Sequence, residues 1–379
     1  MTRRLEDLKV AIVADWLTDR GGAERVILAL ADIFPHADIF TSVFKSENFP
    51  ELAGRHITTT YLQRWLFRFK QQLYSWARPK AFESLNLDAY DLVISSSHAE
   101  AKGVITQPYT THICYCHTPT RYYWSHYHQY LKARQFGVFD PIIKLFLPSM
   151  IHRLREWDRV AADRVDFFIA NSRHTQNRIR KFYHNDSTII NPPVNFDRFS
   201  TIAEAGDYYL VLGRQISYKR TDLVVEAFTD LPYKLKVVGD GPELEKLKKL
   251  ALEKENIEFL GRIGDTEVTR LVLGCKALIF PQEEDFGIVP LEAMSAGRPV
   301  IAYGCGGALE TVLDGQTGIL FPDQTVASLV EAVKKFEQTH ISPDACREQA
   351  KKFDEEVFKQ KILEFVQSHI GVKPKVREL

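Results

Sequence analysis

The sequence lacks the features that would assign it to a membrane or to an oxidising compartment. No apolar run approaches the roughly 20 residues of a membrane-spanning helix, and the N-terminal MTRRLEDLKV has no apolar signal-peptide core. The five cysteines are odd in number and scattered, which argues against a disulfide framework and for a reducing compartment. We therefore expect a cytoplasmic protein without a transmembrane helix.

Net charge is also absent, because 49 Lys+Arg balance 49 Asp+Glu. Together with the absence of any nucleic-acid-binding fold pattern, this argues against a nucleic-acid-binding module. The charge is nevertheless uneven: residues 1–195 contain 25 Lys+Arg and 19 Asp+Glu (+6), which leaves 24 and 30 (−6) for the rest. A positive N-terminal half would suit peripheral contact with an anionic membrane surface, such as the inner face of the cell membrane.

The apolar pattern predicts two α/β domains. A length of 379 residues exceeds one ordinary core. Short β-branched runs alternate with helical patterns, which is typical of parallel sheets covered by helices. The expected strands are 9–15, 91–97, 112–117 and 166–172 in the first half, and 208–214, 234–240, 257–262, 277–282 and 299–304 in the second.

The stretch INPPVNFDRF (190–199) separates these two series of strands, and its consecutive prolines exclude both a helix and a central strand. We place one Rossmann-like domain at 1–193 and the other at 194–355. The helical stretch from about 343 to 370 follows, and we expect the C-terminal helix, about 356–379, to pack back on the first domain. Ligands of such folds bind at the carboxyl ends of the strands, so we expect the two domains to face each other across a cleft.

The loop after the first strand contains Gly21 and Gly22 before a helical pattern. Glycines at a helix start allow a ligand to approach free backbone amides, and the helix dipole favours an anion there. A tight turn between strand and helix explains such a pair equally well. Phosphate contact and a structural turn therefore both stay open.

Two cations follow the first strand of the second half. Arg214 ends the strand and Lys219 lies five positions later, so both heads can reach one point above the sheet edge. Arginine forks onto phosphate oxygens and lysine supplies a compact charge. The alternative is a pair of solvated surface cations.

The stretch EEDFGIVPLEAMSAGRPVIA (283–302) holds Glu284 in a loop and Glu292 in a helix, eight positions apart. Gly287 marks the turn between them, and the backbone amides of Phe286, Gly287, Ile288 and Val289 would point into one space. Dipole compensation could explain Glu292 but not Glu284. Two carboxylates around a phosphate-binding helix start could instead bind hydroxyls on either side of a diphosphate.

This stretch closely resembles the signature of retaining glycosyltransferases of family 4, which have the two-Rossmann GT-B fold. The resemblance extends to GGAER, GRQISYKR, GDGPEL and CHTPTRYYW, and so covers nearly the whole chain. The longer stretch CHTPTRYYWSHYHQYL (116–131) is similar to the subgroup that contains mannosyltransferases of bacterial surface-polysaccharide assembly.

The resemblance implies roles for single residues of the donor site. Arg214 and Lys219 would hold the donor diphosphate, Glu292 the ribose hydroxyls and Glu284 the sugar hydroxyls. An amide of Gly22 would lie near the phosphates.

The same resemblance assigns His117 to the transferred sugar and the loop with Arg262 and Ile263 to stacking on the base. A core histidine is the alternative for His117, and metal binding by it with its neighbouring cysteines is disfavoured because no second pair of ligands follows at zinc spacing. One departure is Arg220, which replaces the glycine that commonly follows the lysine and puts the turn geometry there in doubt.

The function implied is retaining transfer of a hexose, expected to be mannose from GDP-mannose, onto a glycan or lipid-linked acceptor. Cations and helix amides would neutralise the leaving diphosphate, so we expect no metal and no cofactor. The alternatives are another UDP- or GDP-hexose donor, a nucleotide-sugar epimerase or phosphorylase of this fold, and a non-catalytic sugar-nucleotide-binding protein.

Residues 61–80, YLQRWLFRFKQQLYSWARPK, interleave five cations with aromatic residues and contain no acid. A basic aromatic helix of this kind can lie in a membrane interface. The alternative is a helix whose aromatic residues pack inward while its cations are solvated.

Overall fold

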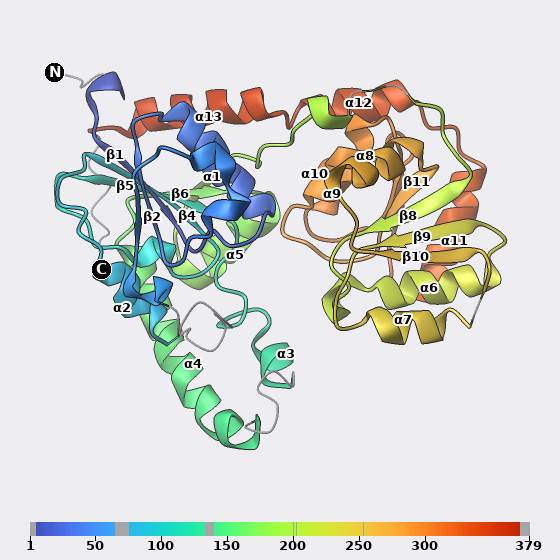
Figure 1. Ribbon diagram of the computed structural model, residues 1–379, viewed down its shortest axis with the longest axis horizontal. Helices are drawn as coiled ribbons and strands as arrows, with labels where there is room; N and C mark the ends of the chain where they lie inside the picture. The colour runs from blue at the N-terminus through green and yellow to red at the C-terminus, as the bar shows by residue number, and fades with distance from the viewer. Residues whose placement is uncertain are drawn as a thin grey trace. The chain divides into compact units, whose positions relative to one another are not determined.

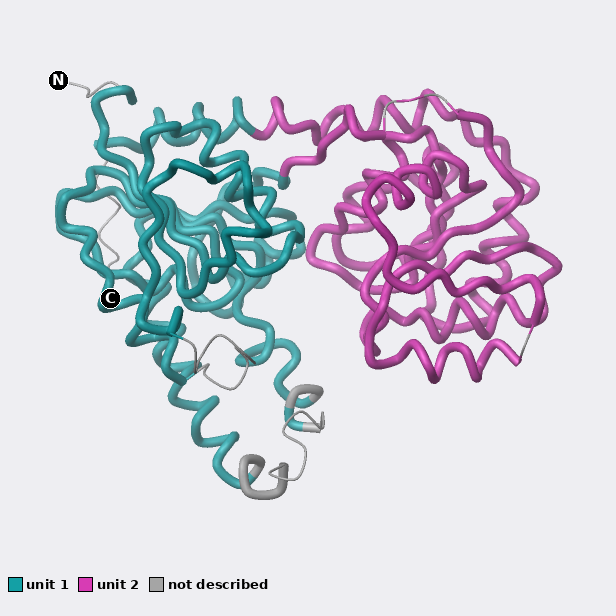
Figure 2. Tube along the Cα trace, viewed as in Figure 1, with its two compact units in different colours: residues 1–192, 359–379 teal, residues 193–358 magenta. Residues whose placement is uncertain are grey.

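The computed structural model describes residues 5–64, 76–132, 140–199, 201, 203–252 and 254–371. The chain divides into two compact units, as Figure 2 shows. Unit 1 comprises residues 1–192 and 359–379, and unit 2 comprises residues 193–358. The sequence-based boundary after residue 193 lies one residue from this division.

Unit 1 is built on a seven-stranded, fully parallel sheet of order β3-β2-β1-β4-β5-β6-β7 (Figure 1). Its strands are β1 Val10–Ala14, β2 Asp38–Thr41, β3 Ile57–Thr59, β4 Leu92–Ser97, β5 Thr111–Cys116, β6 Phe167–Ala170 and β7 Ser187–Ile189. The central strands β1 and β4 are buried along their whole length. This burial on both faces is the reason that they read as continuous apolar and small-residue runs rather than alternating ones.

The helices of unit 1 connect and cover these strands. They are α1 Gly22–Ile33, α2 Arg78–Glu83, α3 Tyr127–Lys132, α4 Asp140–Asp163 and α5 Arg173–Tyr183. Helix α1 packs on β1 and β4 through Val26, Ile27 and Leu30, the apolar positions at helical spacing. The long helix α4 extends away from the sheet (Figure 1).

Unit 2 contains a six-stranded parallel sheet of order β10-β9-β8-β11-β12-β13. Its strands are β8 Tyr208–Leu212, β9 Lys234–Val238, β10 Ile257–Gly261, β11 Ala277–Phe280, β12 Val300–Tyr303 and β13 Gly318–Phe321. Its helices are α6 Thr221–Asp230, α7 Leu244–Leu250, α8 Asp265–Gly274, α9 Ile288–Ser295, α10 Ala308–Thr311, α11 Val326–Glu337 and α12 Pro343–Lys351. One apolar core joins the strands to these helices.

The helical stretch expected from about 343 to 370 is interrupted. Helix α12 ends at Lys351, and α13 (Glu355–His369) begins after a break in which the N–H of Val194 donates to the carbonyl of Phe353 at 3.1 Å. The segment that contains Val194 thus forms a hydrogen bond with a backbone carbonyl in the break between the two helices. Beyond it, Lys359 pairs with Asp32 of unit 1 at 3.5 Å, and residues 359–379 belong to that unit.

Among the described residues, no helix is both long and apolar enough to cross a bilayer.

Candidate functional site

The strand order of unit 2 reverses between β8 and β11. From β8 the chain proceeds to β9 and β10 on one side, whereas β11, β12 and β13 lie on the other. Loops that leave two such neighbouring strands at their carboxyl ends diverge, and open α/β folds bind ligands in the resulting crevice. The residues predicted to bind the donor lie mostly in the loops after β8 and β11.

The structure brings Lys219 and Glu284 together at this point. Lys219 lies in the 3₁₀ turn Ser217–Lys219 after β8, Glu284 lies in the loop after β11, and the ammonium group donates to the Glu284 carboxylate. Both side chains are about one-fifth exposed (19% and 20%), so a ligand can reach them. A group that binds one of these charges must therefore lie beside the other.

Gly307 fixes the backbone of the loop that contains Glu284. Its N–H donates to the carbonyl of Glu284 at 2.8 Å, and a Cβ at this position would lie only 2.1 Å from the carbonyl oxygen of Phe286. Only glycine permits this approach. Gly307 was not predicted as a site residue, although a Gly-Gly pair after β12 can indicate a close backbone approach.

Helix α9 begins directly after this loop. Gly287 is its N-cap in the left-handed region (φ 87°), with no side-chain cap and no acid in the first turn. Anions are stabilised by such helix ends. Glu292 lies in the fifth position of the helix and is 5% exposed.

The side chains around this helix start face the core rather than a ligand. Phe286 is buried against Phe353 (ring centroids 5.7 Å apart), and Ile288 and Val289 pack against the same core. These predicted donor-binding residues can therefore contact an anion only through their backbone.

Arg214, the second residue after β8, is exposed, and its guanidinium forms no ion pair within the described part of the chain. The next residue, Gln215, is buried and bonds through its side-chain amide to the carbonyls of Gly213 (2.8 Å) and Val238 (3.1 Å). These bonds join the loop after β8 to the end of β9. Gly239, directly after β9, is required because a Cβ there would lie 1.9 Å from the carbonyl oxygen of Gly213.

Arg220 adopts the left-handed conformation that its sequence position demands. Its φ of 52° and ψ of 33° are those that glycine favours, so the turn before α6 is kept without the glycine. The guanidinium bonds to Asp222 (3.2 Å) and Gln324 (2.8 Å), and so points to structural partners.

Arg262 and Ile263 follow β10. Arg262 is exposed, whereas Ile263 is partly buried against the core. The structure thus places one polar and one apolar side chain in this loop, and their assignment to the base stays a prediction.

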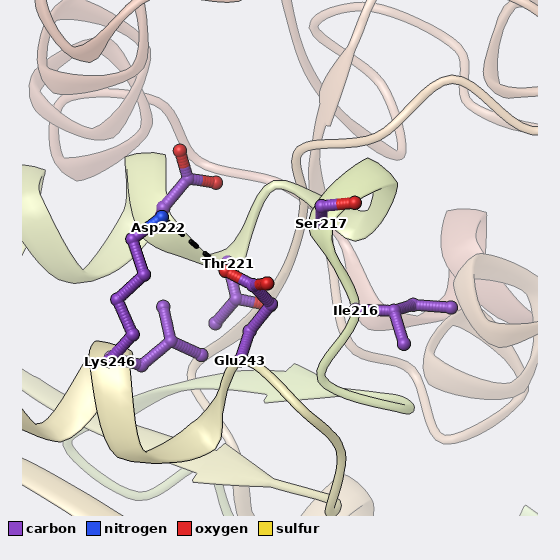
Figure 3. Close-up of a pocket in the computed structure, with 7 residues that line it drawn as sticks. Ile216, Ser217, Thr221, Asp222, Glu243 and Lys246 are labelled. Atoms are coloured by element: carbon purple, nitrogen blue, oxygen red, sulfur yellow. Dashed lines mark hydrogen bonds and ion pairs between the residues drawn. The ribbon is translucent and has the colours of Figure 1, made fainter. Parts of the chain in front are cut away.

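A pocket lies beside the loop after β8, between the start of α6 and α7 (Figure 3). It is lined by Ile216, Ser217, Thr221, Asp222, Glu243, Lys246 and Leu247. None of the predicted site residues lines it, so it is not the predicted donor site.

In unit 1, the strand order reverses between β1 and β4. Asp15, directly after β1, accepts hydrogen bonds from the backbone N–H groups of His98 (2.7 Å), Ala99 (2.9 Å) and Ala101 (2.7 Å) in the loop after β4. The His98 ring also contacts the same carboxylate through Nδ1 at 3.2 Å. The sequence analysis named neither Asp15 nor His98 as a site residue.

His117 follows β5 in the same unit. Its Nε2 lies 2.8 Å from the hydroxyl of Ser96, and its backbone carbonyl accepts from Asn171 (2.9 Å) and Thr175 (3.1 Å). The His117 ring packs edge-on against that of His98, with centroids 6.2 Å apart. The predicted sugar contact thus lies beside a second histidine.

The N-terminus of α1, where Gly21 and Gly22 were predicted to contact phosphate, already has an acid beside it. The Glu24 carboxylate accepts hydrogen bonds from the backbone of Gly21 and of Glu24 itself. A Cβ at Gly21 would lie 2.9 Å from Glu24 Oε2, the end of a flexible side chain. Burial, with Asp19 and Asp15 nearby, raises the pKa of Glu24 from 4.5 to about 7. Phosphate contact here stays a prediction, and a phosphate would have to share the N-terminus of α1 with the Glu24 carboxylate.

The basic aromatic segment 61–80 needs a correction at Arg78. Residues 65–75 lie outside the described residues, and the described remainder contains a 3₁₀ turn at its start and the first residues of α2. Arg78 is neither solvated nor available to a membrane, since it is buried in an ion pair with Glu100 (3.1 Å) and stacks over Trp16. Arg78 thus neutralises the buried carboxylate of Glu100, although the two residues lie far apart in the sequence.

All five cysteines are free thiols. In the part of the chain that the structure describes, no group of three or more His, Cys, Asp or Glu side chains is placed to hold a metal ion.

Comparison with known families matches two consecutive models. Residues 20–198 match the family described as Glycosyltransferase Family 4, and residues 195–353 match Glycosyl transferases group 1. The first match falls in unit 1 and the second in unit 2.

Two curated relatives are mannosyltransferases. An alpha-1,3/1,6-mannosyltransferase of Dictyostelium discoideum is 47% identical over 92 residues, which are 24% of this chain and 21% of the relative. A GDP-mannose-dependent alpha-(1-6)-phosphatidylinositol monomannoside mannosyltransferase of Mycolicibacterium smegmatis is 31% identical over 202 residues, or 45% of this chain and 52% of the relative. The chain thus matches about half the length of these curated relatives, or less.

Among solved structures, HepE of Anabaena, crystallised with UDP, has a similar fold. Its TM-score is 0.69 at 18% identity, with 95% of this chain and 100% of HepE covered. The predicted GT-B fold with two Rossmann-like domains is confirmed.

Proposed function

This chain belongs to the glycosyltransferases of family 4, and we propose on that basis that it moves a hexose from a nucleotide-sugar donor onto a glycan or lipid-linked acceptor. The observation that carries this proposal is the Lys219–Glu284 pair beside the N-terminus of α9. One cation, one carboxylate and an uncapped helix end suit a ligand in which a sugar is joined directly to a diphosphate.

In the proposed reaction, Lys219, Arg214 and the amides at the start of α9 bind the donor diphosphate. Negative charge grows on this group as its bond to the anomeric carbon breaks, so preorganised cations and amides stabilise the transition state more than the ground state. Glu292 binds the ribose hydroxyls and Glu284 those of the sugar. Because protein groups supply the positive charge, no metal is needed.

We propose that the transfer retains the anomeric configuration. The acceptor oxygen attacks the anomeric carbon on the face that the phosphate leaves, and the acceptor proton passes to the departing phosphate oxygen. One C–O bond forms and one breaks, with no protein nucleophile.

The donor we propose is GDP-mannose. Support comes from the two mannosyltransferase relatives, one of which is named for its dependence on GDP-mannose, and from the CHTPTRYYWSHYHQYL stretch. Arg262 and Ile263 would contact the base. The acceptor would be a growing surface polysaccharide or its lipid-linked precursor.

We also propose that the protein works in the cytoplasm at the inner face of the cell membrane. The +6 balance of residues 1–195 supports attraction to anionic lipid, where each basic residue near the surface contributes about 1 kcal/mol. Co-sedimentation with phosphatidylserine vesicles at low and high salt tests this. Equal recovery in the supernatant with and without vesicles would contradict it.

A thermal-shift panel of GDP-, UDP- and ADP-sugars, followed by product analysis with and without an acceptor glycoside, tests the function. A ligand at 100 times its dissociation constant stabilises the fold by about 2.7 kcal/mol. We expect the greatest shift with GDP-mannose and a glycoside product only when an acceptor is present. Conversion of the donor to another nucleotide sugar without acceptor would support an epimerase instead.

A further inference from the structure

Each of the two sheets has a pair of polar or charged side chains in contact with each other. Each pair follows the two neighbouring strands between which the strand order reverses. In unit 2, Lys219 and Glu284 follow the neighbouring strands β8 and β11, where the strand order reverses. In unit 1, Asp15 and His98 follow β1 and β4, where the order also reverses. This is the position at which open α/β sheets bind ligands, and the proposed donor contacts leave the pair in unit 1 unused.

Asp15 holds His98 in one orientation. The carboxylate is 2% exposed and takes three backbone N–H bonds from the His98 loop, so the loop cannot move without breaking them. The same carboxylate lies 3.2 Å from Nδ1 of His98. The negative charge of this carboxylate beside Nδ1 favours the tautomer in which Nδ1 carries the proton of the neutral ring.

The His98 ring stays neutral and presents its other nitrogen as an acceptor. Burial, reinforced by Arg78, Arg121 and Lys102, lowers its pKa to about 3. With the proton on Nδ1, Nε2 has a free lone pair, and the side chain is 28% exposed.

The surroundings of His98 suit a sugar hydroxyl. A small pocket, with room for about one hydroxyl-sized group, is lined by His98 together with Asp15, Trp16, Glu24 and Ser96. The Trp16 ring meets that of His98 edge-on with centroids 4.5 Å apart. An aromatic face surrounded by hydrogen-bonding groups complements the apolar ring face and polar rim of a sugar.

We propose that His98 orients the acceptor, with its Nε2 accepting a hydrogen bond from a hydroxyl group next to the one that attacks the donor, and that Asp15 is the positioning residue that fixes this ring. The inference rests on the proposed function and adds a residue for its acceptor side. The attacking hydroxyl itself stays free to pass its proton to the departing phosphate oxygen.

The test exploits the two ring nitrogens. In His98→Asn the amide nitrogen replaces Nδ1 and keeps the contact with Asp15, but nothing replaces Nε2. In His98→Gln the amide reaches the position of Nε2 instead. The matched control is His56→Asn. His56 also contacts an aspartate through Nδ1 (Asp38, 2.9 Å), but it precedes β3 and so lies at the amino ends of the strands, whereas His98 lies at the carboxyl ends.

We measure transfer from GDP-mannose to a panel of methyl glycosides, together with donor affinity and donor hydrolysis in water. His98→Asn should lower kcat/KM for the glycoside at least tenfold and leave donor affinity and hydrolysis within twofold of wild type. His98→Gln should recover part of the loss, and His56→Asn should match wild type. Asp15→Asn should show the same acceptor-specific loss, because an amide N–H directed at Nδ1 favours the tautomer that carries its proton on Nε2.

Two results would overturn the assignment: unchanged glycoside kinetics in His98→Asn, or an equal loss of donor affinity. A wild-type protein that binds donor but transfers no hexose would count against the proposed function instead. In that case the ¹⁵N shift of His98 Nε2 on addition of glycoside decides the binding claim, since an unchanged shift at saturating glycoside contradicts it.

Discussion

Lys219 and Glu284 form an ion pair that joins the loops after β8 and β11. The two side chains were predicted to bind different parts of one ligand, the diphosphate and the sugar. In a nucleotide sugar those parts are covalently adjacent. The proximity of the two side chains is compatible with such a ligand, and their roles stay a prediction.

Replacing either cation of the donor site should impair turnover while the fold survives. Loss of one charged hydrogen bond to a phosphate costs about 1.5 to 3 kcal/mol, so Lys219→Ala and Arg214→Ala should each lower kcat/KM by about 10- to 100-fold. Steady-state kinetics and the melting temperature measure the two effects separately.

The control for this pair is Lys246→Ala. Lys246 lies in the same unit and pairs with Glu243 at 3.4 Å, but it lines the pocket of Figure 3 rather than the predicted site. It should leave turnover unchanged. Near-wild-type turnover in Lys219→Ala or Arg214→Ala would contradict the diphosphate assignment.

Metal independence is the second expectation. If Lys219, Arg214 and the α9 amides neutralise the leaving group, activity should persist after dialysis against EDTA. A complete loss that manganese restores would show that the leaving group needs a cation that the protein does not supply.

Glu24 should make stability fall with pH. Its pKa is raised in the folded protein, from 4.5 to about 7, so the folded state binds this proton more tightly than the unfolded state. The stabilising effect of protonation is complete below pH 4.5 and is lost as the pH rises to about 7. A shift of this size corresponds to about 3 kcal/mol.

Glu24→Gln removes this titration and keeps an oxygen for the Gly21 N–H. Its free energy of unfolding should exceed that of wild type at pH 8, and the difference should shrink toward pH 4.5. Denaturant melts at both pH values measure this, with the exposed Glu331→Gln as control. A constant difference across the range would mean that Glu24 does not titrate there.

The central strands and the donor-site loops are predictable because their signals are local. All nine expected strands exist, whereas β2, β3, β7 and β13 were not predicted. Strands β3 and β7 contain three residues each, too few for a periodic pattern, whereas β2 and β13, with four each, are as long as the predicted β6, β11 and β12. Their pairing depends on neighbours that the sequence does not place beside them.

Contacts between distant residues are the part that sequence reasoning could not supply. Asp15 and His98 lie 83 positions apart, and Arg78 meets Glu100 only because α2 and the loop after β4 pack together. Glu24 is different, since a small N-cap residue followed three positions later by glutamate is a recognisable capping pattern.

The two acids of the second domain should be separable by calorimetry. Glu292 lies in α9 and Glu284 in the preceding loop, on either side of the Gly287 turn and the helix start. If Glu292 binds ribose, Glu292→Ala should weaken nucleoside diphosphate and intact donor alike, because both contain ribose. If Glu284 contacts only the sugar, the Glu284→Ala variant should bind nucleoside diphosphate as tightly as wild type does, while its kcat falls sharply. This pattern is expected for an interaction used mainly in the transition state.

Conservative variants separate charge from folding in this experiment. Glu284→Gln keeps the volume but loses the pair with Lys219, so any gain in nucleoside diphosphate affinity would report the release of that cation for phosphate. Glu292 is buried, so Glu292→Gln is the safer partner for Glu292→Ala. An equal loss of nucleoside diphosphate affinity at both positions would place the two carboxylates on the same part of the ligand. The helix start would then lie at one end of the donor rather than between its sugar and its ribose.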